Sequence, residues 1–347
     1  MTRDLINFDL YPSLVCNKGC QYCYMNETKC PGLLDLSLLD ESLHQVAETY
    51  KDAILKVFLL GGEPLMLPVS YINKLLYICR KYTDVIAIAT NLSYYKKFSD
   101  IDKASDLIMT SSMDNIIHIC EAGKDKFDDW VRIVEENNLH PNHPIHFGMG
   151  TSYVKELFYT TQVIDAYSAN ITHIDVEMFH GKFRREDLDY LNKYKQSLID
   201  TIPKLNQMIS IYKRKSKEHD RILSNACFMG ENEYLRHVYT TALLPDGKFL
   251  IGDVNVYNML EDDTVRYFDN AVDVLKYFAS IFDIFKSKDG GKHTCPECQF
   301  FNRCVVNHVS RRFDDVSECD IYQVFLKYAK PVDRDPFVDK SWIWFIP

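Results

Sequence analysis

Three cysteines near the start of this chain have a spacing that suits metal binding. Cys16, Cys20 and Cys23 stand in the segment Cys-Asn-Lys-Gly-Cys-Gln-Tyr-Cys, which spaces them C-x-x-x-C-x-x-C. Three thiolates can hold a four-iron, four-sulfur cluster and leave one iron open to a substrate or cofactor. A structural zinc loop is the alternative. Because zinc normally takes four protein ligands, that loop would need Cys30 as the fourth.

A second group of cysteines lies near the other end of the chain. Its members are spaced C-x-x-C-x5-C-x14-C and are Cys295, Cys298, Cys304 and Cys319. Four thiolates close a metal site completely. The spacing alone therefore fits either a zinc site or a fully ligated iron-sulfur cluster.

The N-terminal cysteines follow the first of a series of short apolar runs that are typical of buried strands. These runs cover residues 5–10, 54–60, 85–90, 106–112, 144–150 and 171–178. Apolar residues recur at helical spacing over 36–50, 69–82, 126–137, 153–169 and 186–217, and Ser37 with Asp40 suits a capping box. The alternation predicts an α/β domain over residues 1–218, a partial (β/α)6 TIM-type barrel with its chemistry at the carboxyl ends of the strands.

The pattern changes after residue 218. Residues 239–250 are typical of a hairpin, because Pro245-Asp246-Gly247 supplies turn residues between two apolar runs. Helices are expected over 272–285 and 318–330. Residues 219–347 are therefore expected to form a small, metal-stapled C-terminal domain.

Composition excludes several classes of protein. The chain of 347 residues has 40 Lys and Arg against 49 Asp and Glu, a net charge of −9, and its basic residues are dispersed, so no nucleic-acid surface stands out. No apolar run reaches the roughly 18 residues of a membrane helix. Asp4 and Asp9 stand where a secretory signal would be apolar. We expect a cytoplasmic protein, in whose reducing surroundings the 11 cysteines serve as metal ligands or reactive thiols rather than disulfides.

The N-terminal cysteine motif resembles the signature of the radical S-adenosylmethionine superfamily, in which an aromatic residue, here Tyr22, precedes the third cysteine. The resemblance covers roughly residues 5–180. It implies an enzyme in which S-adenosylmethionine chelates the open iron. Electron transfer from the cluster then cleaves this cofactor to a 5′-deoxyadenosyl radical, which abstracts hydrogen from the substrate.

Further elements of that family follow at the ends of successive predicted strands. The segment 61–64, Gly-Gly-Glu-Pro, resembles the element that holds the methionine amino group. Thr90-Asn91 resembles the TN(G) element, although Leu92 replaces the usual glycine. The segment 112–114 resembles the S-x-D element that contacts the methionine carboxylate or ribose, and 148–151 is a weaker match to the adenine contact. The resemblance thus implies a cofactor-binding set of Tyr22, Gly61, Gly62, Glu63, Asn91, Ser112, Asp114 and Gly150.

The C-terminal cysteines resemble part of the auxiliary-cluster extension, called SPASM or twitch, of these enzymes. Gly252 and His308 stand where the extension has ligands of its first auxiliary cluster. The resemblance therefore implies one auxiliary four-iron, four-sulfur cluster on Cys295, Cys298, Cys304 and Cys319, used as an electron relay or a structural staple. Cys227 can be free, and His308 is either a ligand in an altered site or a structural histidine.

Asp253 directly follows the position of the missing cysteine, at the edge of the predicted hairpin. It is the candidate catalytic residue, a general base that would accept a proton after hydrogen abstraction. A solvated loop aspartate is the alternative.

Enzymes with this extension mostly modify ribosomally made peptides or proteins, by crosslinking, epimerisation, excision or oxidation. By analogy, a peptide or protein is the leading substrate, with a reductant such as flavodoxin or ferredoxin. Because the first strand is expected by about residue 5, either a separate protein recognises the precursor or the substrate is not a leader-bearing peptide. The alternative is a small-molecule dehydrogenase or epimerase acting on a sugar, aminocyclitol or nucleotide-like substrate. A third interpretation is an iron-sulfur scaffold without catalysis.

Overall fold

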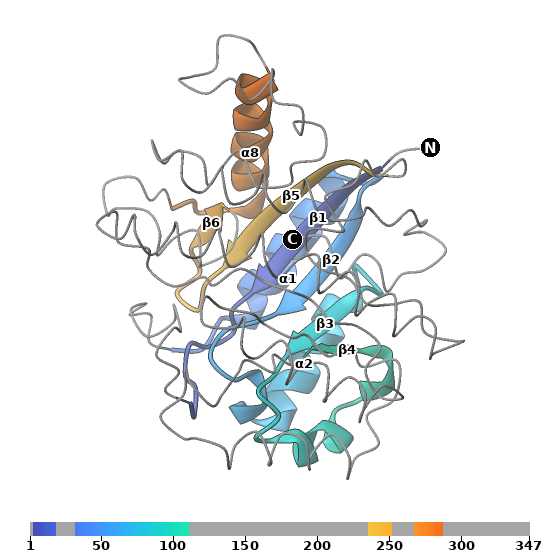
Figure 1. The fold of residues 1–347 in the computed structure, drawn as a ribbon, viewed down its shortest axis with the longest axis vertical. Coiled ribbons are helices and arrows are strands. Elements are labelled where there is room, and N and C mark those ends of the chain that lie inside the picture. Colours follow the sequence, from blue (N-terminus) through green and yellow to red (C-terminus); the bar gives the residue numbers. More distant parts are fainter. Residues whose placement is uncertain (1–2, 19–31, 111–234, 252–266, 287–347) are drawn as a thin grey trace, which may run out of the picture.

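The structure is a computed structural model that describes residues 3–18, 32–110, 235–251 and 267–286. These ranges form a six-stranded sheet with helices α1, α2 and α8 packed on one of its faces (Figure 1). None of the helices in these ranges has the length and apolarity needed to cross a membrane.

The first four strands run parallel in chain order, as the alternation of strands and helices predicts. In β1 and β2 the pairing runs from Leu5 opposite Ile54 to Leu10 opposite Leu59. The predicted barrel strands over 144–150 and 171–178 lie outside the described residues. The four described strands are β1 (Arg3–Leu10), β2 (Ile54–Leu59), β3 (Ile86–Ala89) and β4 (Ile108–Thr110).

Alternate residues of these strands point toward the helices and form the core. Ile6, Phe8 and Leu10 of β1 are fully buried on this face. They pack with apolar residues of α1 (Leu36–Thr49) and α2 (Val69–Cys79), whose bounds match the helical spacing within a turn. Each fully buried side chain of this size stabilises the fold by about 1.5–3 kcal/mol. The predicted helices over 126–137, 153–169, 186–217 and 318–330 lie outside the described residues.

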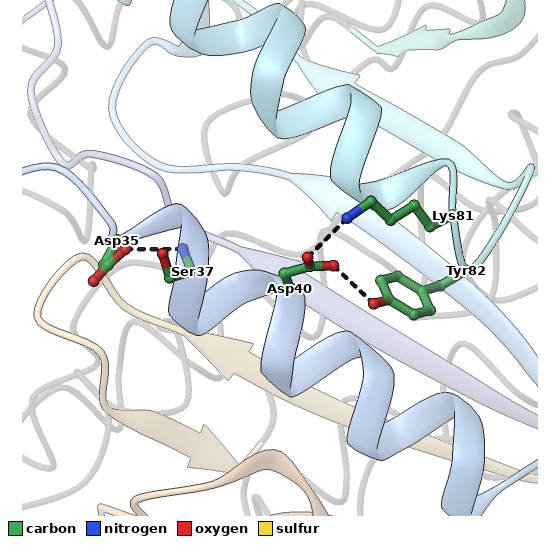
Figure 2. A network of polar contacts seen from close by, with 5 residues as sticks. All are labelled: Asp35, Ser37, Asp40, Lys81 and Tyr82. Atoms are coloured by element: carbon green, nitrogen blue, oxygen red, sulfur yellow. Dashed lines mark hydrogen bonds and ion pairs between the residues drawn. The ribbon is translucent and has the colours of Figure 1, made fainter.

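The capping box expected at the start of α1 is wrong. Asp35 is the N-cap, and its Oδ1 accepts the backbone N–H of Ser37 at 2.8 Å. The carboxylate of Asp40 instead reaches across to the end of α2, where it accepts Lys81 Nζ and Tyr82 OH, both at 2.7 Å (Figure 2). These two hydrogen bonds lower the pKa of Asp40, and the one from Lys81 has the larger effect. The carboxylate thus links the two helices rather than closing the first turn.

The predicted hairpin is present, and it extends the N-terminal sheet. Strand β5 (Leu235–Leu243) pairs parallel with β1 on the side opposite β2. Strand β6 (Phe249–Ile251) then pairs antiparallel with β5. Gly247 adopts a φ of 84° in the turn, a conformation that glycine adopts without strain. The strand order is therefore β4-β3-β2-β1-β5-β6.

Helix α8 (Ala271–Lys286) agrees with the helix expected over 272–285. It contacts β5, β6 and α1, so it continues the helical layer beyond the hairpin (Figure 1). The division into residues 1–218 and 219–347 falls outside the described residues and stays a prediction. Within the described residues, the hairpin belongs to the same sheet as β1, and α8 belongs to the helical layer that covers this sheet.

Candidate active site

The loops that follow β1 and β2 are joined at the carboxyl edge of the sheet. Gly62 donates its backbone N–H to the carbonyl of Ser13 at 3.0 Å, and Glu63 donates to the carbonyl of Val15 at 2.9 Å. The segment that carries Cys16 is therefore held against the segment that carries Glu63. This is the edge where parallel barrels place their chemistry.

Both glycines of the pair are required by this close approach. A Cβ on Gly61 would lie 2.3 Å from the carbonyl oxygen of Ser13, and its φ is 115°. A Cβ on Gly62 would lie 2.1 Å from the carbonyl oxygen of Val15. Any side chain at these positions would push the two loops apart.

Glu63 is a buried acidic group at this edge. Its side chain is buried, with the residue 2% exposed. Oε1 accepts the backbone N–H of Leu65 at 2.9 Å and the hydroxyl of Thr90 at 2.8 Å. Oε2 accepts the backbone N–H of Asn91 at 2.6 Å. Both carboxylate oxygens are thus held in place by the chain itself.

The environment of Glu63 disfavours its charge. Burial raises the pKa of this carboxyl, and the hydrogen bonds from Asn91, Leu65 and Thr90 and the charge of Lys18 only partly offset that rise. A cation placed against the carboxylate would offset the remaining desolvation penalty. The site is therefore suited to a positively charged ligand group.

Asn91 connects the two loops to the loop after β3. Its Nδ2 donates to Cys16 Sγ at 3.7 Å and to Asn17 Oδ1 at 2.9 Å, while its backbone N–H binds Glu63. Cys16, Glu63 and Asn91, which the sequence assigns to separate motifs, therefore meet at one place.

Leu92 stands where the TN(G) element has glycine, and it adopts a backbone conformation that favours glycine. Its φ is 61°, in the left-handed region that residues other than glycine rarely adopt. The residue is 1% exposed. Burial of the leucine in the core offsets the backbone strain. The turn after β3 thus forms with a leucine at this position.

The other predicted site residues lie outside the described residues and stay predictions. Of the three cysteines of the N-terminal motif, Cys16 lies within the described ranges. Within these ranges no group of three or more His, Cys, Asp or Glu residues is placed to hold a metal ion. At Ile251, the last described residue of β6, the chain runs toward the amino ends of its parallel neighbours, away from Cys16. The residues concerned are Cys20, Tyr22, Cys23, Ser112, Asp114, Gly150, Asp253, Cys295, Cys298, Cys304 and Cys319.

The sequence analysis missed a group of buried polar residues on the sheet face opposite the helices. Asn7, Asp9 and Lys56 are at most 7% exposed, and alternation along β1 and β2 places them on that face. Asn7 Nδ2 donates to Thr240 Oγ1 of β5 at 3.4 Å. Burial lowers the pKa of Lys56 to about 8, against the opposing attraction of Asp9. The sequence does contain an indication of this polar group, because Asp9 and Lys56 interrupt two otherwise apolar strands.

Cys79 is a core residue at the end of α2. It is fully buried, and burial raises the pKa of its thiol to about 12. Cys79 is therefore unsuited to metal binding or nucleophilic chemistry.

No protein-family model matches the sequence. No curated protein matches it either. Solved structures do match. Native anSMEcpe with bound AdoMet and Cp18Cys peptide aligns with a TM-score of 0.59 at 15% identity, over 93% of this chain and 96% of that one. SuiB from Streptococcus suis bound to precursor peptide SuiA aligns with a TM-score of 0.52 at 13% identity, over 86% of this chain and 70% of SuiB.

SuiB bound to S-adenosylmethionine aligns similarly, with a TM-score of 0.50 at 14% identity, over 86% of this chain and 71% of SuiB. At these identities the likeness shows the fold. The chain shares the fold of these solved structures, and the α/β class with parallel strands that is expected for its N-terminal part is confirmed. The iron-sulfur C-terminal domain stays a prediction.

Proposed function

We propose that this protein is a radical S-adenosylmethionine enzyme that modifies a peptide or protein. The observation that carries the proposal is the contact of Asn91 with both Cys16 and Glu63. These residues come from the cysteine motif and the glycine-rich motif, which were identified separately in the sequence. Their meeting at the carboxyl edge of the sheet supports one shared site.

The described residues fit an iron-sulfur cluster with S-adenosylmethionine beside it. Cys16 Sγ accepts N–H groups from Lys18 at 3.4 Å and from Asn91, which suits a thiolate ligand. The buried carboxylate of Glu63 suits the methionine ammonium. When bound, the cluster and its cofactor would supply a 5′-deoxyadenosyl radical that abstracts hydrogen from the substrate. Cys16 would hold the cluster together with Cys20 and Cys23.

Glu63 would bind and orient the ammonium group. Its two oxygens are already fixed by the donors from Leu65, Thr90 and Asn91, so little ordering remains when the ligand arrives. The glycines at 61 and 62 would let the backbone of this loop approach the ligand as closely as it approaches Ser13 and Val15.

A peptide substrate is supported by two of the similar structures. AnSMEcpe is solved with the Cp18Cys peptide, and SuiB with its precursor peptide SuiA. If the substrate is instead a small molecule, the same radical chemistry would act on a sugar, an aminocyclitol or a nucleotide-like compound. The peptide interpretation predicts a small open reading frame beside this gene. Incubation of the enzyme with the peptide that it encodes should change the peptide mass, as measured by mass spectrometry.

The first experiment measures metal content and paramagnetic resonance on protein reconstituted anaerobically and reduced with dithionite. We expect about eight irons per chain, from two four-iron clusters, and a signal that S-adenosylmethionine perturbs. Formation of 5′-deoxyadenosine should require Cys16, Cys20 and Cys23, and replacing all three by Ala should abolish it. Cleavage that survives in this variant contradicts the proposal. About four irons with one zinc would keep the radical chemistry and make the C-terminal site structural.

The C-terminal site is tested separately. We propose that Cys295, Cys298, Cys304 and Cys319 hold one auxiliary cluster, so Cys295→Ala should lose about half of the iron. Unchanged iron content excludes Cys295 as a ligand. We also propose Asp253 as the general base: Asp253→Asn should keep 5′-deoxyadenosine formation and lose substrate modification. Loss of both would instead indicate a structural role.

A further inference from the structure

Asn91 contacts two groups of the proposed site, one through its side chain and one through its backbone. Its Nδ2 donates to Cys16 Sγ at 3.7 Å, and its backbone N–H donates to Glu63 Oε2 at 2.6 Å. The same Nδ2 also donates to Asn17 Oδ1 at 2.9 Å, which holds the amide beside the cysteine loop. One residue of the β3 loop thus contacts both the cysteine loop and the carboxylate.

The orientation of this amide is fixed by a third contact. The backbone N–H of Ser93 donates to Asn91 Oδ1 at 3.0 Å, so Oδ1 faces the chain and Nδ2 faces the sulfur. The turn is anchored on the other side as well, since the Thr90 hydroxyl donates to Glu63 and accepts the backbone N–H of Leu92 at 3.1 Å. The donor is therefore held toward Cys16 by the turn itself.

Hydrogen bonds to the sulfur ligands of an iron-sulfur cluster are among the factors that set its reduction potential. An N–H group draws charge from the thiolate and so favours the reduced cluster, which carries one more negative charge. Cys16 Sγ accepts such a bond from the backbone N–H of Lys18 and another from the side chain of Asn91, and truncating Asn91 removes the second while keeping the first.

We infer that Asn91 is a positioning residue that raises the reduction potential of the cluster through Cys16 and fixes the cysteine loop relative to Glu63. This inference rests on the proposed function, because it requires a cluster on Cys16. Electron delivery to the cluster and binding of the ammonium group would then depend on one turn.

The test is a redox titration followed by paramagnetic resonance on the reconstituted full chain. Asn91→Asp keeps the oxygen that accepts from Ser93 and replaces the donor by a negatively charged oxygen. Asn91→Ala removes both side-chain groups and keeps the backbone donor to Glu63. We expect both variants to lower the ratio of reduced to oxidised N-terminal cluster about tenfold at a fixed potential, which is a shift of about 59 mV for one electron. The shift in Asn91→Asp should be the larger of the two.

Asn73→Ala is the matched control. The Asn73 amide also holds a loop, by accepting the backbone N–H of Asp102 at 2.9 Å, but none of its described contacts reaches Cys16. Its cluster ratio should stay at the wild-type value. Unchanged ratios in both Asn91 variants, with iron content and the S-adenosylmethionine-perturbed signal retained, overturn the inference and leave the proposed function standing. If Asn91→Ala fails to assemble the cluster, Asn91→Asp decides alone. A wild-type protein without a perturbed signal contradicts the proposed function instead.

Discussion

Glu63→Gln is expected to weaken the binding of S-adenosylmethionine by about 10- to 150-fold. The substitution keeps the size of the side chain and removes its charge, so the ammonium group loses a charge-assisted hydrogen bond in a buried setting. Such bonds contribute about 1.5–3 kcal/mol, and each 1.4 kcal/mol is a factor of ten in affinity. The residue is 2% exposed, so water screens the lost interaction little.

The same substitution also has a calculable structural cost. Oε1 accepts hydrogen bonds from Leu65 and Thr90, and Oε2 accepts one from Asn91. In glutamine one of these oxygens becomes an NH₂ group, which cannot accept the hydrogen bond of the backbone N–H that faces it. One buried donor is left without its acceptor, which costs about 1–3 kcal/mol of stability. Removal of a buried charge offsets part of this cost.

The assay is isothermal titration of S-adenosylmethionine into anaerobically reconstituted protein, with the thermal unfolding midpoint measured in parallel. Glu41→Gln is the matched control, because Glu41 is exposed on α1 and its described hydrogen bond, to Gln45, is also exposed. It should bind as the wild type does. An affinity of folded, cluster-loaded Glu63→Gln within threefold of wild type would refute the assignment of this carboxylate to the ammonium group.

Three further predictions follow from the same region and from the sheet beneath it. Gly62→Ala should lower the unfolding free energy and prevent cluster assembly, because its Cβ would lie 2.1 Å from a carbonyl oxygen. Gly32 has a φ of 120° but open space around its Cβ, so Gly32→Ala should cost only the backbone strain of about 1–3 kcal/mol and should leave cluster assembly intact. Equal losses in the two variants would contradict the steric argument. Leu92→Gly should be less destabilising than Leu92→Ala by about 1 kcal/mol in denaturant unfolding, because glycine relieves the positive φ of 61° while both variants lose the buried side chain; the usual order, with alanine more stable, would contradict it. Burial lowers the pKa of Lys56 from 10.5 to about 8, so between these pH values the folded state binds fewer protons than the unfolded state. The free energy of unfolding should therefore rise by about 3 kcal/mol as the pH increases from 8 to 10.5. Lys56→Met should lack this rise in pH-dependent unfolding, and identical pH profiles would contradict the placement of the ammonium group.

Local patterns predicted the parallel strands and the helices well, because buried strands and one-sided helices follow from the apolar periodicity of neighbouring residues. Contacts between distant segments were not predictable in this way. The capping role given to Asp40 failed because its partners, Lys81 and Tyr82, come from the end of the next helix. The hairpin was predicted from its turn, but nothing in its own sequence indicates that β5 pairs with β1.

The site shows the same division. The motif at 61–64 predicted Glu63, and the structure adds why its carboxylate is fixed. The motif at 90–91 predicted Asn91 as a cofactor residue. Its contact with Cys16 depends on the turn conformation, and hence on the positive φ of Leu92, which a motif does not specify. Lys56 was not predicted because its strand was identified only as an apolar run. A charge within that run indicates a buried polar group on the sheet face opposite the helices.

The placement of β5 bears directly on the cysteine motif. β5 continues the ladder past the end of β1, because Tyr11 donates its backbone N–H to the carbonyl of Leu243 at 2.9 Å. On the other side, Gly62 and Glu63 donate to the carbonyls of Ser13 and Val15. The segment leading into Cys16 is thus held by backbone hydrogen bonds from both of its neighbours in the sheet, and these bonds do not depend on side chains. Substitutions of surface side chains in the hairpin should therefore leave the position of Cys16 unchanged, whereas shortening the 244–248 turn, which would pull on Leu243, should disturb cluster assembly.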